Sequence, residues 1–277
     1  MQFNTKETLP DFKTPPVIEV VCGVIFKPIR EMTTPHLGLL WTKFQSSYPR
    51  CREVAPLAPV VEGFDEQPHI SQSSVVEEMP SFLLPRIWFE SDDGRGLIQI
   101  QKDRFHYNWK KKEESDEYPH YVNVLASFRQ YFQCFETFLD ENHLGVLEPL
   151  QYEITYVNHV SHGEGWQSLD TIQSLFPDIT WQNAENRFLP CPEQINVRWS
   201  FLLPNRSGRL HIGINKGTRL RDKTPLLVLN ITARGITEDR SRQAMWQWFD
   251  VAHEWIVSGF ADVTARKVQE EIWKRMQ

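Results

Sequence analysis

The sequence predicts an α+β fold in which antiparallel sheets carry long helices on one face. Two observations lead to this prediction. Stretches that alternate polar and apolar residues, as half-buried strands do, follow one another in groups separated by short turns. Two longer stretches, 119–141 and 238–260, repeat apolar residues every three or four positions, as amphipathic helices do. Strands joined by tight turns pair in the antiparallel sense, which indicates the α+β class.

The first half of the sequence predicts the order strand, helix, three strands, helix. Pro15 and Pro16 precede an apolar run that predicts a buried strand, and Pro35 marks the first turn of a helix. Strands are predicted over 17–26, 81–90, 97–102 and 104–111, and helices over 35–47 and 119–141. Residues 49–80 contain five prolines and predict a long irregular loop, with an edge strand near Val60.

The second half predicts the same order of elements. Pro149 precedes a strand, Pro177 ends a short helix, and Asp262 or Thr264 can cap a last helix. Strands are predicted over 150–160, 194–203, 209–216 and 226–234, and helices over 166–176, 238–260 and 263–276.

The repeated order predicts an internal duplication. Two pseudo-repeats of strand–helix–three strands–helix would occupy 1–148 and 149–277, either as two α+β halves or as one continuous domain. Residue identity between the halves is low, so the duplication rests on element order alone. The two four-stranded sheets would either join edge to edge into one curved sheet or form two separate layers.

Composition and charge narrow the functional classes. The net charge of −6 argues against a nucleic-acid partner, because a basic surface is typical of nucleic-acid binders. The first residues lack the apolar core of a signal peptide, and no apolar run is long enough to span a membrane. The four cysteines form no CxxC pair. These features predict a cytoplasmic protein with reduced thiols and no membrane contact.

Cys22 raises the question of whether it reacts or only packs. It lies in the first predicted strand among valines, where a cysteine acts as a small apolar side chain. Burial in such surroundings raises the thiol pKa and suppresses its reactivity. We therefore interpret Cys22 as a packing residue and not as a nucleophile.

Alternation along the strands predicts two distinct sheet faces. One carries apolar side chains such as Ile98, Phe105, Ile154 and Ile212, which the helices would cover. The other is rich in Gln, Asn, His and Arg, whereas a plain solvated face more often carries Lys, Glu and Thr. We take this polar face as the candidate binding surface, with a solvated face as the alternative. Its candidate residues are Gln99, Gln101, His106, Asn108, Lys110, Thr155, His159, Arg198, His211 and Asn215.

The motifs that could carry catalysis or bind a metal are weak. His159, His162 and Glu164 are close in sequence, but a strand end does not converge ligands as zinc requires. His253 lies on the last long helix without an HExxH pattern, and we expect it to hydrogen-bond a neighbouring element. The sequence contains no phosphate-binding glycine loop and no nucleophile elbow. We therefore predict no catalytic residue, no metal and no cofactor.

Four segments carry a family resemblance. They are PPVIEVVCGVIF (15–26), LIQIQKDRFHYNWKK (97–111), YEITYVNHV (152–160) and AHEWIVSGFADVT (252–264). Together they resemble a sporadically distributed family of uncharacterised bacterial proteins of similar length. The resemblance implies no catalytic residues. The patchy distribution of that family resembles the distribution of mobile defence and toxin–antitoxin genes.

These observations predict a non-enzymatic protein-binding or regulatory protein. Its partner would be another protein, encoded in the same defence or toxin–antitoxin operon. The alternative is a sensor that binds a small molecule or a nucleotide between the helices and the sheet, because long helices over a curved sheet can enclose a pocket. An enzyme of unrecognised class is less favoured, and the oligomeric state stays open.

Overall fold

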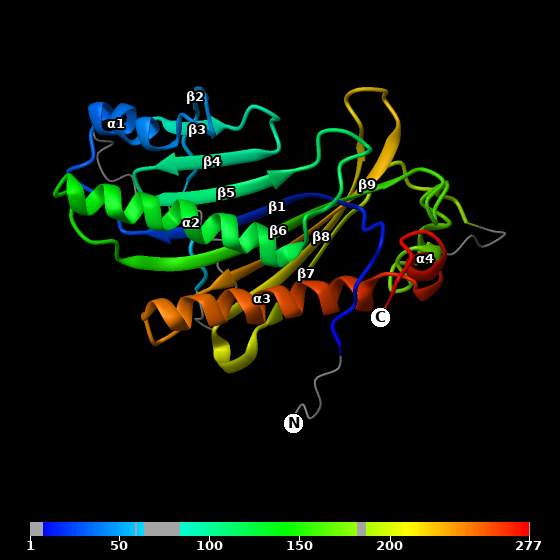
Figure 1. The fold of residues 1–277 in the computed structure, drawn as a ribbon. Coiled ribbons are helices and arrows are strands. Elements are labelled where there is room, and N and C mark those ends of the chain that lie inside the picture. The colour runs from blue at the N-terminus through cyan, green and yellow to red at the C-terminus, as the bar shows by residue number, and fades with distance from the viewer. Residues whose placement is uncertain (1–7, 59, 64–83, 182–186, 277) are drawn as a thin grey trace.

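Nine strands of the described residues hydrogen-bond into one antiparallel sheet, in the order β2-β3-β4-β5-β1-β6-β9-β8-β7 (Figure 1). The structure, a computed structural model, describes residues 8–276 except 59, 64–83 and 182–186. The strands are β1 (Val17–Phe26), β2 (Arg50–Val54), β3 (Arg86–Glu90), β4 (Gly96–Gln101), β5 (Arg104–Lys110), β6 (Pro149–Ser161), β7 (Asn196–Leu202), β8 (Gly208–Thr218) and β9 (Pro225–Gly235). The prediction of an α+β fold with antiparallel strands is confirmed.

The two long strands β1 and β6 lie side by side at the centre of the sheet. β1 pairs with β5 on one side and with β6 on the other. Outward from β1 the order is β5-β4-β3-β2, and outward from β6 it is β9-β8-β7. Of the two predicted arrangements, the single continuous sheet is therefore the correct one. The predicted order of elements is not repeated within the described residues: a helix and four strands, β2–β5, follow β1, whereas only a 3₁₀ turn comes between β6 and the three strands β7–β9. The internal duplication itself stays a prediction.

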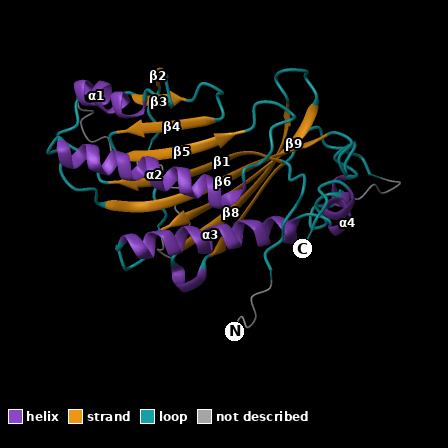
Figure 2. Ribbon diagram, in the orientation of Figure 1, coloured by secondary structure: helices purple, strands orange, loops and turns teal. Residues whose placement is uncertain are grey.

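Three helices cover one face of the sheet, as predicted (Figure 2). They are α1 (Thr34–Phe44), α2 (His120–Glu141) and α3 (Arg242–Val263). Phe105 on β5 stacks on Phe135 of α2 with ring centroids 5.2 Å apart, and Tyr152 on β6 packs on Trp248 of α3 at 5.6 Å. Such rings bury large apolar areas, so the core lies between the helices and the sheet. Within the described residues, each helix is too short or too polar to span a membrane.

The long proline-containing stretch holds a strand that the sequence pattern missed. β2 pairs with β3 at the edge of the sheet, although the whole stretch 49–80 was predicted as loop apart from Val60. Most of the side chains of β2 are exposed, so they show no apolar alternation by which a strand is detected. Val60 itself lies in no strand, and residues 64–83 are outside the described residues.

Two predicted helices are wrong in extent. Of the helix predicted over 166–176, only a 3₁₀ turn, η1 (Ile172–Ser174), is formed. The hydroxyl of Thr171 accepts hydrogen bonds from the backbone N–H groups of Gln167 and Ser168, which compete with helical bonds. The helix predicted over 263–276 is shortened to α4 (Arg266–Glu271), and Ala265 is its N-cap rather than Asp262 or Thr264.

Residues 9–15, the terminal segment, run beside residues 273–276 near the other end of the chain. Phe12 forms an antiparallel bridge with Arg275, and the backbone N–H of Lys13 donates to the carbonyl oxygen of Lys274 at 3.2 Å. The Phe12 ring packs edge-on against Phe260 of α3, with centroids 5.3 Å apart. These contacts hold the terminal segment against the end of α3, where it covers part of the candidate site.

Candidate functional site

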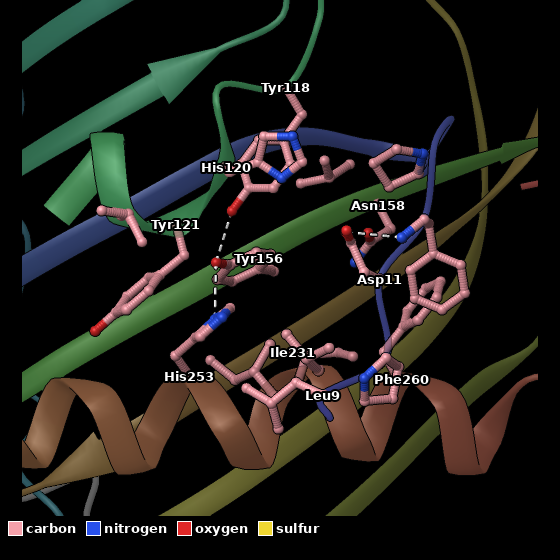
Figure 3. Close-up of a pocket in the computed structure, with 17 residues that line it drawn as sticks. Leu9, Asp11, Tyr118, His120, Tyr121, Tyr156, Asn158, Ile231, His253 and Phe260 are labelled. Atoms are coloured by element: carbon pink, nitrogen blue, oxygen red, sulfur yellow. Dashed lines mark hydrogen bonds between the residues drawn. The ribbon is translucent and has the colours of Figure 1, made fainter. Parts of the chain in front are cut away.

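A cavity lies between the first turn of α2, the middle of α3, strand β6 and the terminal segment (Figure 3). Its volume is about 220 Å³, which is the liquid volume of roughly seven water molecules. Val17 and Ile231 line it from the sheet, and Ile256 and Phe260 line it from α3. All four side chains are buried apolar groups, so this part of the cavity favours an apolar ligand.

Three polar side chains form a hydrogen-bonded network in the cavity wall, which we call the Tyr–His network (Figure 3). The hydroxyls of Tyr118 and Tyr156 are 2.8 Å apart, and the Tyr156 hydroxyl lies 3.1 Å from Nδ1 of His253. The expectation that His253 hydrogen-bonds a neighbouring element is therefore confirmed. The three residues come from the segment before α2, from β6 and from α3.

The Tyr–His network is electrically neutral at physiological pH. Burial lowers the pKa of His253 to about 4, which leaves its imidazole uncharged. Burial also raises the pKa of Tyr118 and of Tyr156 well above the ordinary tyrosine value. Each hydroxyl therefore keeps its proton and can donate as well as accept a hydrogen bond.

Tyr121 fixes the orientation of the His253 ring. The two rings stack with centroids 3.9 Å apart and an interplanar angle of 6°. The Tyr121 hydroxyl in turn donates to the carboxylate of Asp250 at 2.9 Å, one turn before His253 on α3. Because Tyr121 is held by Asp250 and stacks on His253, the imidazole ring stays in place. The proton of the ring can therefore move from one nitrogen to the other without a change in the position of His253.

Asn158 is a polar residue at a buried position of β6, with 4% of its surface exposed. Its Nδ2 donates to the carbonyl oxygen of Leu229 at 3.1 Å, and it lines the cavity. Within the described residues, its carboxamide oxygen has no hydrogen-bond partner. Because Asn158 lines the cavity, this oxygen can accept a hydrogen bond from a ligand.

His120 contributes a strained backbone at the cavity. It is the first residue of α2 and has a φ of 64°, in the left-handed region that non-glycine residues rarely adopt. Such strain costs on the order of 1 kcal/mol, and it is found most often at functional sites. His120 lines the cavity together with its neighbours Tyr118 and Tyr121.

Cys22 lies inside the core and does not reach the cavity. It is fully buried, and burial raises the pKa of its thiol well above the ordinary value. The interpretation of Cys22 as a packing residue is confirmed.

The ten candidate residues of the polar face lie where the alternation placed them. The strand register puts all of them on the sheet face opposite the helices, for example through the pairs Gln99–His106 and Thr155–Thr232. The expectation of an open face is wrong for four of them, because Gln99, Gln101, His106 and Asn108 are buried. Lys110, Thr155, His159, His211 and Asn215 are half-buried, and Arg198 is exposed. A role of these residues in binding a partner stays a prediction.

Internal hydrogen bonds explain the burial of this face. Asn108 accepts from Nε2 of Gln99 at 2.6 Å and donates to Glu19 at 2.5 Å. Gln101 accepts from the backbone N–H of Leu57 at 2.8 Å. His106 is the exception, because its buried Nε2 has no hydrogen-bond partner among the described residues; its ring lies directly over Gly23, and burial lowers its pKa to about 4.

The described residues 55–58 and 60–63, the crossing segment, lie across this polar face. After Leu57 they contact β6 through Gln151, whose carboxamide oxygen accepts from the backbone N–H of Glu62 at 2.8 Å. Glu62 then accepts hydrogen bonds from Arg209 and His211 on β8. Burial alone would raise the pKa of Glu62, but the hydrogen bonds and charges of His211 and Arg209 outweigh it and lower the pKa. His211 is thus engaged within the protein.

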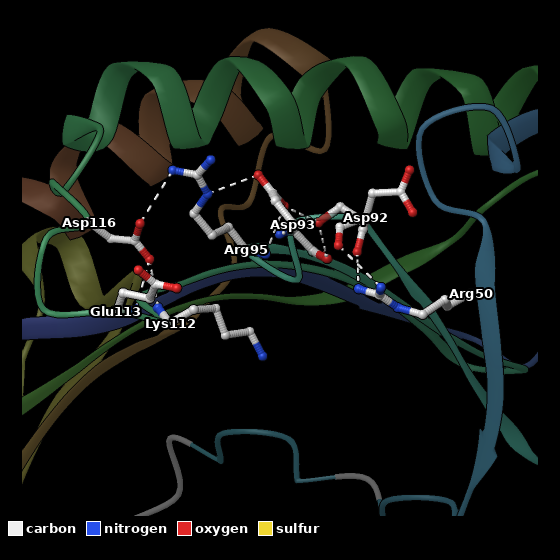
Figure 4. A network of polar contacts seen from close by, with 9 residues as sticks. Arg50, Asp92, Asp93, Arg95, Lys112, Glu113 and Asp116 are labelled. Carbon is white, nitrogen blue, oxygen red and sulfur yellow. Dashed lines mark hydrogen bonds and ion pairs between the residues drawn. The ribbon is translucent and has the colours of Figure 1, made fainter.

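A second cavity, of about 390 Å³, lies between α2 and the β3–β4 turn. A network of polar contacts holds this turn (Figure 4). The guanidinium of Arg95 contacts Asp93 at 2.8 Å and Asp116 at 3.4 Å. Hydrogen bonds from the Ser91 hydroxyl and the Arg95 backbone hold the pKa of Asp93 at about 2. The charged groups of this network satisfy one another, so it fixes the turn and does not itself call for a ligand.

Of the three residues considered as metal ligands, Glu164 and His162 make contacts within the local loop, whereas His159 lies in β6. Glu164 accepts from the backbone N–H of Ser161 at 2.9 Å, and the His162 ring packs edge-on against Trp166. Within the residues that the structure describes, no three His, Cys, Asp or Glu side chains are grouped to hold a metal ion.

Sequence reasoning missed the residues of the cavity. The alternation along the strands gives no sign that the hydroxyls of Tyr118 and Tyr156 meet His253. One feature of the sequence did indicate the cavity. Asn158 is polar at a position of β6 where the alternation predicts a buried apolar side chain. No family model matches the chain, and no curated protein matches it. The geometry of the site therefore carries the functional argument.

Proposed function

We propose that this protein binds a small neutral molecule in the cavity between α2, α3 and β6. The observation that carries the proposal is an apolar cavity whose wall holds hydrogen-bonding groups with free capacity. Such a combination is typical of ligand sites, where apolar area supplies affinity and a few polar groups supply orientation. Asn158 and the Tyr–His network supply these polar groups.

The charges around the cavity support a neutral ligand. Asp11 is the one Asp, Glu, Lys or Arg side chain among the lining residues, and its Oδ1 already accepts from the backbone N–H of Phe12 at 2.9 Å. A charged ligand would have to leave water without an opposite charge to pair with, except at Asp11. A neutral molecule avoids that cost.

The His120→Gly substitution tests the site without unfolding it. Glycine adopts the left-handed backbone freely, so we expect unchanged stability or a gain of up to about 1 kcal/mol. We also expect the variant to lose affinity for fragments that bind the wild type, because an imidazole is removed from the cavity. Thermal denaturation and ligand-observed NMR with a library of neutral fragments measure the two effects.

The matched control is His143→Gly. His143 also has a positive φ, of 56°, and lies just beyond the other end of α2. We expect the same effect on stability and no effect on fragment binding. Equal fragment affinity in both variants would show that His120 does not contribute to the site. If the wild type binds no fragment, the proposed function is refuted.

A protein partner is the second candidate function, and the outer edge of β7 favours it. Among the described strands, β7 ends the sheet, so one row of its backbone N–H and C=O groups has no strand to pair with. β7 exposes Phe201 and Leu202, with Arg198 as its one charged side chain, whereas the opposite edge strand β2 is rich in charge. We infer that a partner adds an extended segment to β7 as a further strand.

The Phe201→Asp substitution tests this edge. We expect the wild-type protein, purified from its native host, to retain a protein partner in equal amounts. The Phe201→Asp variant should lose that partner. Leu39→Asp is the control, since Leu39 is an exposed apolar residue on α1. Both variants should melt like the wild type, and retention of the partner by Phe201→Asp would place the contact elsewhere.

The remaining expectations belong to the same proposal. The protein would act without catalysis in the cytoplasm, as a regulator within a defence or toxin–antitoxin operon, and would belong to the bacterial family that its segments resemble. The halves 1–148 and 149–277 would derive from one duplicated unit.

A further inference from the structure

The Tyr–His network has two free ends. Tyr156 is the central member, and its hydroxyl contacts both Tyr118 and Nδ1 of His253. Within the described residues, the Tyr118 hydroxyl has no second hydrogen-bond partner and Nε2 of His253 has none. Both residues line the cavity, so a ligand can complete the hydrogen bonding at either end.

The hydrogen bonds of this network can run in two directions. In the first, His253 carries its proton on Nδ1 and donates to Tyr156, Tyr156 donates to Tyr118, and the Tyr118 hydroxyl is free to donate. In the second, Tyr118 donates to Tyr156, Tyr156 donates to Nδ1, and His253 carries its proton on Nε2. The Tyr118 hydroxyl therefore donates to a ligand in the state in which Nε2 of His253 accepts, and it accepts in the state in which Nε2 donates.

Exchange between the two directions conserves charge. One proton leaves Nδ1 of His253 and one arrives at Nε2 through water, while both hydroxyls turn. The three side chains hold three protons in each state, because the imidazole stays neutral at physiological pH. The stacking of Tyr121 keeps the ring in place, so no change of position is needed.

We propose that the ligand is a neutral nitrogen heteroaromatic of one or two fused rings, and that the Tyr–His network reverses its direction to match a donor or an acceptor on it. This inference rests on the proposed small-molecule function and names its ligand class. The volume of about 220 Å³ suits such a ring system. Aromatic rings of Tyr118, Tyr121 and Tyr156 line the cavity and favour a planar ligand.

Three probes of similar shape separate the contribution of the hydrogen bond to affinity from the contribution of apolar contact. Indole donates through its N–H, quinoline accepts through its ring nitrogen, and naphthalene does neither. We expect indole and quinoline each to bind about fivefold more tightly than naphthalene, since one net hydrogen bond contributes about 1 kcal/mol. Titrations followed by NMR measure the three affinities.

The protonation pattern of His253 gives a second, independent measurement. Two probes that contact the same end of the network require opposite polarity there, so indole and quinoline should select opposite tautomers at that end. ¹⁵N NMR of the labelled imidazole distinguishes Nδ1–H from Nε2–H directly. We expect one tautomer with indole and the other with quinoline.

Tyr156→Phe breaks the network at its centre, and Tyr152→Phe is its matched control. Tyr152 lies on the same strand and face and is fully buried, and within the described residues its hydroxyl makes no hydrogen bond to the Tyr–His network. We expect Tyr156→Phe to weaken indole and quinoline about fivefold and to leave naphthalene unchanged. Tyr152→Phe should leave all three affinities unchanged.

The outcomes that contradict the inference differ from those that contradict the proposed function. If all three probes bind equally and His253 keeps one tautomer, the network does not choose the ligand, although the cavity still binds apolar molecules. If none of the three binds, both the ligand class and the proposed function are overturned.

Discussion

Gly23→Ala is expected to destabilise the protein by about 2 kcal/mol, within the range measured for overpacked cores. A Cβ added at Gly23 would lie 1.8 Å from Cδ2 of His106, far inside contact distance. The His106 ring is 4% exposed and has no open space to move into without disturbing its neighbours. At about 2–4 °C per kcal/mol, the melting temperature should fall by about 4–8 °C.

Gly213→Ala is the matched control for this substitution. Gly213 lies on the same face of β8, and the nearest atom to an added Cβ is the carbonyl oxygen of Asn230 at 4.0 Å. We expect no loss of stability there, because alanine is better suited than glycine to a strand.

A double-mutant cycle then assigns the effect of Gly23→Ala to the ring. With His106→Ala in the background, Gly23→Ala should cost less than half of what it costs alone. A Gly23→Ala protein as stable as the wild type would mean that the ring does not lie over β1.

Phe12→Ala is expected to cost about 3 kcal/mol and to release the terminal segment. Phe12 is 6% exposed, and its ring packs edge-on against Phe260 and Trp273. Calorimetry measures the loss of stability. Hydrogen exchange should show faster exchange of the Lys13 and Thr14 amides, which donate to the backbone of residues 273–274.

The same substitution should also weaken ligand binding, because the terminal segment lines the cavity. Lys13→Ala is the control, since Lys13 lies in the same segment, is exposed and does not line the cavity, and the substitution should cost less than about 1 kcal/mol. Unchanged amide protection in Phe12→Ala would show that the backbone bonds alone hold the segment.

Much of the fold could be predicted from the sequence because strand and helix periods are local. Alternation over 97–102 and 104–111 located β4 and β5 nearly to the residue. The apolar stripe of 119–141 is buried as predicted, including Phe128, Phe132 and Phe135. β2 was missed for the converse reason, since an exposed, charged edge strand has no buried face to produce a pattern.

The candidate site could not be predicted in the same way. Tyr118, Tyr156 and His253 are 38 and 97 positions apart along the chain, and each alone looks like a core aromatic or a helix histidine. Their contact depends on the continuous sheet, which brings β1 and β6 together beneath α2 and α3. Asn158 was the one local sign that a buried position carried a polar group.

The sequence by itself determined the two long helices, most of the strands and which side of those strands is apolar. It could do so because backbone geometry repeats every two residues in a strand and every 3.6 in a helix. Only the tertiary structure decided which polar groups have hydrogen-bond partners within the protein and which keep a donor or acceptor open toward the cavity. Gln101 is satisfied by Leu57 and His211 by Glu62 across the sheet, whereas Tyr118 and His253 keep an open end toward the cavity. A polar group is free or engaged according to the neighbours that folding brings to it, and those neighbours are distant in sequence.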